Sequence, residues 1–207
     1  MKKYKYILVI VTAFVLLSLA ACTGENEKAD TRIFDSGTLT VTFDYEKQSG
    51  YASNQFAVWI EDMDGNYIQT LYATKFTANG GYKNRPDSIS TWVAKSDLAN
   101  MTKSEVDAIA GATPKSGPLS YAWDMTAANG DVVQPGEYKF FVEGTLRWKN
   151  YVLYSGVITL GDESATVIAD VEFVYEASDG QAALTSDSPE NAMIGAVTVN
   201  FTPTFDK

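Results

Sequence analysis

The sequence contains no histidine and only one cysteine among its 207 residues. Without histidine the chain cannot build Ser-His-Asp or Cys-His catalytic groups, a histidine-ligated zinc site, or the usual general base near pH 7. With a single cysteine it cannot form an internal disulfide, so an exported domain has to be stable through its hydrophobic core alone. These absences disfavour the commonest hydrolase and metalloenzyme classes.

Basic residues are also few. Lys and Arg total 16 against 26 Asp and Glu, which gives a net charge of -10, and removing the three lysines near the N-terminus makes it -13. Such an acidic surface repels phosphate backbones, and no basic patch is visible, so we expect no nucleic-acid partner. A composition of 45% hydrophobic and 20% charged residues is that of an ordinary globular domain.

Residues 1–21 have the features of a secretory signal peptide: a basic start, an apolar stretch and small residues before the cysteine. The apolar stretch from Tyr6 to Leu17 is shorter than the roughly 20 residues of a membrane span. The peptide Leu-Ala-Ala-Cys at 19–22 resembles the bacterial lipobox, which implies a diacylglycerol on Cys22 and a membrane contact through this lipid anchor.

We therefore expect an exported lipoprotein in the cell envelope, at the periplasmic face or cell surface, with the outer membrane favoured. Residues 22–35 are polar and predict a solvated tether, and residues 36–207 predict one domain. The acidic residues after Cys22 are interpreted either as a plain spacer or as a surface-export signal, which they also resemble.

The body of the chain begins with a period-two pattern typical of a half-buried strand, with apolar side chains at 39, 41, 43 and 45. Strands expected at 55–61 and 67–77 are joined by residues 62–66, where Asp64-Gly65 is a hairpin signal. A calcium site on Asp62 and Asp64 is the alternative, although the later ligands of a calcium loop are missing.

An excursion at about 78–118 interrupts the strands. It offers two short helices, at 87–94 and 102–110, and the second opens with a capping box of Thr102 and Glu105. Further strands are expected at 119–124, 137–147, 151–160, 166–175 and 194–202. The fold class is therefore all-β, an antiparallel β-sandwich of seven to eight strands with a helical insertion.

Two stretches are similar to a known module. Residues 58–71 (VWIEDMDGNYIQTL) and 123–144 (WDMTAANGDVVQPGEYKFFVEG) resemble the signatures of the flagellar-hook-cap type of Ig-like domain. Together with DAIAGATPKSG at 107–117 they resemble, over about 37–175, the predicted periplasmic family named domain of unknown function 2271. This resemblance implies an Ig-like sandwich and names no activity.

The peptide from Asp107 to Thr113 (DAIAGAT) is similar to the acceptor motif of exported flavoproteins, Asp-x-x-(Ser/Thr)-Gly-Ala-Thr. The resemblance implies that a flavin transferase joins the phosphate of FMN to the Thr113 hydroxyl. Asp107 is then read by the enzyme or orients the loop, Gly111 and Ala112 let the backbone approach closely, and Lys115 neighbours the phosphate. Ala110 and Pro114 depart from the pattern, and a helix that ends at Gly111 and Pro114 is the structural alternative.

Three classes of function remain. The first is a non-catalytic carrier of covalent FMN that takes part in extracytoplasmic electron transfer with redox partner proteins. The isoalloxazine ring of the FMN would stack on Trp92, Tyr121 or Trp123, although most of the tryptophans are expected in the core. The second is a protein- or glycan-binding or assembly module without a cofactor. The third and least favoured is an enzyme, a hydrolase with a carboxylate pair among Asp124, Glu137 and Glu143.

Overall fold

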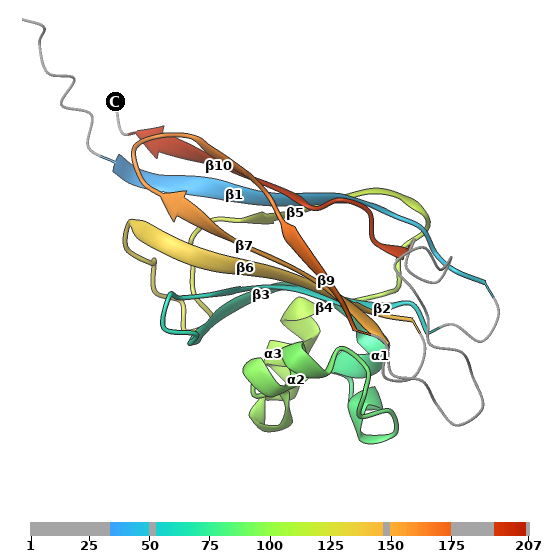
Figure 1. Ribbon diagram of the computed structural model, residues 1–207. Coiled ribbons are helices and arrows are strands. Elements are labelled where there is room, and N and C mark those ends of the chain that lie inside the picture. The colour runs from blue at the N-terminus through green and yellow to red at the C-terminus, as the bar shows by residue number, and fades with distance from the viewer. Residues whose placement is uncertain (1–33, 50–52, 147–149, 175–192, 206–207) are drawn as a thin grey trace, which may run out of the picture. The chain divides into compact units, whose positions relative to one another are not determined.

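A computed structural model describes residues 34–49, 53–146, 150–174 and 193–205 of the chain (Figure 1). The predicted signal peptide, Cys22 and nearly all of the predicted tether lie outside these residues. Within the described part of the chain, no helix has both the length and the apolar character needed to cross a bilayer.

The described residues form ten strands in two sheets that pack against each other (Figure 1). The first sheet is antiparallel and has the order β5-β1-β10-β8, with β1 (Phe34–Tyr45), β5 (Gly117–Trp123), β8 (Ala165–Ile168) and β10 (Thr198–Phe205). The second has the order β4-β3-β2-β6-β7-β9, with β2 (Gln55–Glu61), β3 (Tyr67–Thr74), β4 (Ala110–Gly111), β6 (Gly136–Thr145), β7 (Tyr151–Leu160) and β9 (Asp170–Val174). The predicted all-β sandwich is confirmed.

The core between the sheets follows from the alternation of side chains along each strand. In β1, Leu39, Val41, Phe43 and Tyr45 are all buried, and their partners on β6 include Phe140. The cluster as a whole draws on both sheets and contains Leu39, Val41, Phe43, Tyr45, Phe56, Val58, Ile60, Trp123, Met125, Phe140, Val142, Leu146, Val152, Tyr154, Ile158, Leu160, Met193, Ile194, Val197, Val199 and Phe201.

The single strand predicted at 166–175 is two strands that belong to different sheets. β8 pairs with β10 in the first sheet and β9 pairs with β7 in the second. Between them the Ala169 amide donates to the Val197 carbonyl, so the chain changes sheets at this residue. The last strand is β10, which begins four residues later than the sequence predicts, because Ile194 forms only an isolated bridge with Tyr45.

The insertion carries α1 (Lys75–Ala78), α2 (Ser90–Lys95) and α3 (Lys103–Ile109), with 3-10 turns at Gly81–Lys83 and Leu98–Asn100. In Figure 1 these helices lie together against the outer face of the second sheet. They enclose a second apolar cluster of Ala57, Trp59, Ala73, Ala78, Ile89, Trp92, Leu98 and Val106. All seven residues of β2 are buried because both faces of this strand are covered.

Candidate functional site

Helix α3 leads the chain into the motif at residues 107–113. The predicted capping box is present: the Glu105 amide donates to the Thr102 hydroxyl at 3.3 Å, and the Thr102 amide donates to a Glu105 carboxylate oxygen at 2.6 Å. These bonds hold the pKa of Glu105 below its ordinary value. Val106 points into the cluster under the insertion, which fixes α3 against the sheet.

The helix does not end at a left-handed glycine. Ala110 closes α3 with an extended backbone (φ -91°, ψ 123°), and Gly111 is absent from the residues with positive φ. Instead Ala110 and Gly111 form β4, which runs parallel to Ala73 and Thr74 at the end of β3. The helix thus ends just before Gly111, as the structural alternative expects, but strand pairing and not a left-handed glycine follows its C-cap.

Gly111 is required by its contact with Tyr72. A Cβ atom at Gly111 would lie 2.2 Å from a ring carbon of Tyr72, closer than any real contact allows. The Tyr72 hydroxyl donates to the Ala112 carbonyl at 2.7 Å. The ring thus lies along the backbone of Gly111 and Ala112, and a side chain at the glycine would displace it.

Ala110 occupies the motif position that commonly carries Ser or Thr. Its side chain packs against the apolar cluster beneath the insertion. The apolar side chain at this position therefore suits the packing of this chain.

Thr113 lies in the link between β4 of the second sheet and β5 of the first, where the insertion returns to the sandwich. This link is held before Thr113 by the Tyr72 bond to Ala112, and after it by the Lys47 amide, which donates to the Ser116 hydroxyl at 2.9 Å. Thr113 is half-buried, and its hydroxyl has no hydrogen-bond partner among the residues that the structure describes. Asp107 and Lys115 are exposed.

An aromatic cluster lies beside this link. Tyr72 stacks on Phe56 with ring centroids 5.0 Å apart and contacts Tyr121 at 4.8 Å, and Tyr45 packs on the same Phe56 at 5.3 Å. Burial raises the pKa of Tyr45 and of Tyr72 to about 12, and it raises the pKa of Tyr121 as well. The three phenols therefore stay protonated at neutral pH, and the Tyr72 hydroxyl donates to the Ala112 carbonyl.

Two of the aromatic residues expected to stack on a ligand are not available for it. Trp92 is fully buried with its indole nitrogen donating to the Thr70 hydroxyl, and Trp123 is 3% exposed. Tyr121 is half-buried. Phe76 on α1 is 50% exposed and was not among the aromatic residues predicted to stack on a ligand. Its neighbours in the sequence do not distinguish it from an aromatic residue of the core.

Residues 37–173 match the model of a family described as predicted periplasmic protein, DUF2271. The chain belongs to this family. The match contains both sheets except for β10, the first three residues of β1 and the last residue of β9, and it includes the insertion and the whole motif at 107–113. No curated protein and no solved structure matches the chain. The similarity to Ig-like modules stays a prediction.

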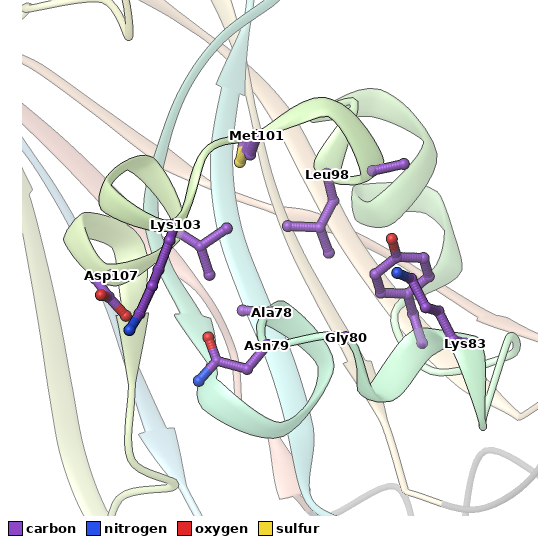
Figure 2. Close-up of a pocket in the computed structure, with 11 residues that line it drawn as sticks. Ala78, Asn79, Gly80, Lys83, Leu98, Met101, Lys103 and Asp107 are labelled. Atoms are coloured by element: carbon purple, nitrogen blue, oxygen red, sulfur yellow. The ribbon is translucent and has the colours of Figure 1, made fainter.

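The insertion of the DUF2271 domain also contains an open pocket of about 420 Å³ (Figure 2). Its residues come from 78–83 on one side and from 98–107 on the other. In Figure 2 Asp107 and Lys103 on α3 extend toward the side on which Asn79 lies. Asp107 thus belongs both to the motif and to the rim of this pocket.

The carboxylates proposed for a hydrolase have different surroundings in the DUF2271 domain. Asp124 and Glu137 are exposed, whereas Glu143 is completely buried beneath α2. Glu143 accepts hydrogen bonds from the backbone amides of Thr91 and Trp92 at 3.2 and 2.9 Å. These bonds join α2 to β6, and the carboxylate does not face solvent.

Acidic residues of the 62–66 turn also have local partners. The two Asp62 carboxylate oxygens accept the backbone and side-chain amides of Asn66 at 2.8 and 2.7 Å, which lowers the pKa of Asp62. The part of the chain described by the structure holds no group of three or more His, Cys, Asp or Glu arranged to bind a metal ion.

Proposed function

We propose that this protein is a lipid-anchored carrier of FMN, joined covalently to Thr113, that passes electrons between partner proteins outside the cytoplasm. The observation that carries the proposal is the state of Thr113: a half-buried hydroxyl without a hydrogen-bond partner in the described part of the chain, in a link that is held on both sides. The family description as predicted periplasmic agrees with a place outside the cytoplasm.

The surroundings of Thr113 fit an acceptor for a phosphate group. Ala112 is small and exposed, so its own side chain offers little steric obstruction beside Thr113, while the Tyr72 ring covers one side of the Gly111 backbone. Lys115 is exposed two residues later and would supply a cation for the singly charged phosphodiester. Asp107 is exposed in the last turn of α3, six residues before Thr113, where a transferase can contact it.

The attachment needs an activated donor, because a hydroxyl does not displace water from a phosphate unaided. The Thr113 oxygen attacks the FMN phosphorus of a flavin dinucleotide, a phosphorus–oxygen bond forms, and the phosphoanhydride bond breaks with release of AMP. The hydroxyl proton passes to a base of the transferase. Bound FMN supplies reversible uptake of two electrons and two protons, and the tether keeps its local concentration high outside the cell.

Co-expression with a flavin transferase and intact-mass measurement tests this proposal. We expect wild type to gain the mass of FMN minus water, and Thr113→Val to gain nothing while keeping its fold, since the two side chains have the same shape. Thr38→Val, at an exposed position of β1, is the matched control and should gain the full mass. Unmodified wild type, in cells that modify a known acceptor, would favour a binding module without cofactor.

The lipid anchor is a separate part of the proposal and has a separate test. Acylated Cys22 would hold the carrier at the membrane that contains its electron donor. We expect wild type to float with membranes in a density gradient and Cys22→Ser to stay in the soluble fraction. Flotation of the Cys22→Ser variant would show that another segment makes the attachment.

A further inference from the structure

The pocket of the insertion combines an apolar floor with a polar rim. Ala78, Leu98 and Val106 are buried at its base. Its size of about 420 Å³ lies within the range of ligand pockets, roughly 300–1,000 Å³. Such a floor suits a flat apolar ring.

The rim carries two cations and one carboxylate. Lys83, Lys103 and Asp107 are exposed and line the pocket, so its ionisable side chains sum to a positive charge although the chain as a whole has a net charge of -10. Asn79 adds an amide that both donates and accepts, and the half-buried ring of Tyr82 lies 5.8 Å below the Lys83 amine. This rim matches a ring with one polar edge and a tendency to gain negative charge.

The topology brings this pocket and Thr113 to the same end of the second sheet. Because β4 runs parallel to β3, both strands leave the sheet at the same end. At this end β3 passes into α1, whose C-cap is the pocket residue Asn79, and β4 passes into Ala112 and Thr113. On the other side, α3 carries Lys103 and Asp107 on the rim directly before β4 (Figure 2).

We infer that this pocket, formed by residues 78–83 and 98–107, is the seat of the isoalloxazine ring of the FMN on Thr113. The inference rests on the proposed function and adds the place of the ring to it. A second open pocket lies near the same link, lined by Thr42, Asp44 and Pro118 among others, and includes a carboxylate but no cation. It does not suit a ring that becomes more negative on reduction.

A titration of the unmodified protein with FMN to millimolar concentration tests the seat without any transferase. Millimolar ligand matches the effective concentration that a short tether provides. We expect amide chemical-shift changes at 78–83 and 98–107, and at least tenfold weaker binding by Ala99→Leu, which adds bulk at an exposed pocket position. Ala94→Leu, on an exposed position outside the pocket, is the matched control and should bind as wild type does.

The flavinylated protein gives the second measurement. Lys103→Gln should disfavour the reduced ring about tenfold, which lowers a two-electron midpoint potential by about 30 mV, whereas Lys139→Gln, at the other end of the second sheet, should leave it unchanged. Shifts centred on 42–44 and 118–120, no saturable shifts at all, or equal effects of Ala99→Leu and Ala94→Leu would overturn the seat. If the protein gains no FMN mass but shows the expected chemical-shift changes, the proposal of a covalent FMN carrier is refuted and the pocket remains a site for free flavin.

Discussion

Glu143 is a carboxylate buried beneath α2 without an ion pair among the described residues, and its protonation should control the stability of the domain near neutral pH. Two effects compete at this group. Burial disfavours the charged form, and the amides of Thr91 and Trp92 favour it. Burial is the larger effect and raises the pKa of Glu143 from 4.5 to about 7.

The sign and size of the effect follow from linkage. Because the folded state binds the proton more tightly than the unfolded state, this group stabilises the domain most below pH 4.5, and the contribution is lost as the pH rises to about 7. A shift of this size corresponds to about 3 kcal/mol of unfolding free energy, at about 1.4 kcal/mol for each pKa unit. Glu143→Gln cannot ionise and should not show this loss.

Urea unfolding at pH 4 to 8, followed by tryptophan fluorescence, measures this difference. We expect the unfolding free energy of wild type, relative to Glu143→Gln, to fall by about 3 kcal/mol across this range. Glu137 is an exposed residue of the same strand, and Glu137→Gln is the control. Its unfolding free energy should change with pH in the same way as that of wild type. A flat difference for Glu143→Gln, or one that grows with pH, would show that the amides outweigh burial and would refute the reasoning.

Two further variants test the structure around the motif. Gly111→Ala should lower the unfolding free energy by about 1–3 kcal/mol, because the new methyl group meets the Tyr72 ring, whereas Gly161→Ala adds a methyl group in open space and should be neutral. Urea unfolding compares the two, and equal stabilities would contradict the close approach. Thr102→Ala should lower the unfolding free energy by about 1 kcal/mol through loss of the capping box, and it should speed amide hydrogen exchange at the start of α3. Thr102→Ser should keep the stability and the exchange rates of wild type. Unchanged exchange in Thr102→Ala would count against the cap.

Features with local causes could be predicted from the sequence. The alternation in β1 correctly assigned four core residues, and the Asp64-Gly65 turn has the positive φ of 84° at Gly65 that a hairpin of this type uses. The capping box of α3 depends only on residues three apart, and it is present. In each case neighbours in the sequence make the contact that stabilises the element.

Features with distant causes could not be predicted. Alternation along β6 correctly turns Phe140 and Val142 inward, but by the same rule Glu143 faces outward toward solvent. It is buried because α2, about 50 residues earlier in the chain, covers this face of the sheet. The same covering buries Trp92, which was considered as a stacking surface. Where an insertion folds back is decided by packing between segments far apart in sequence.

The motif itself illustrates the same distinction between local and distant causes. The seven residues from Asp107 to Thr113 agree equally well with a helix that stops at a glycine and with an acceptor segment. A helix that stops at a glycine commonly has that glycine in the left-handed conformation. Gly111 lacks this conformation and lies in β4, where the Tyr72 ring excludes a side chain and the Tyr72 hydroxyl holds Ala112. Since this tyrosine lies on β3, the glycine has a tertiary cause, and the extended link that it permits brings Thr113 to the end of the sheet beside α1.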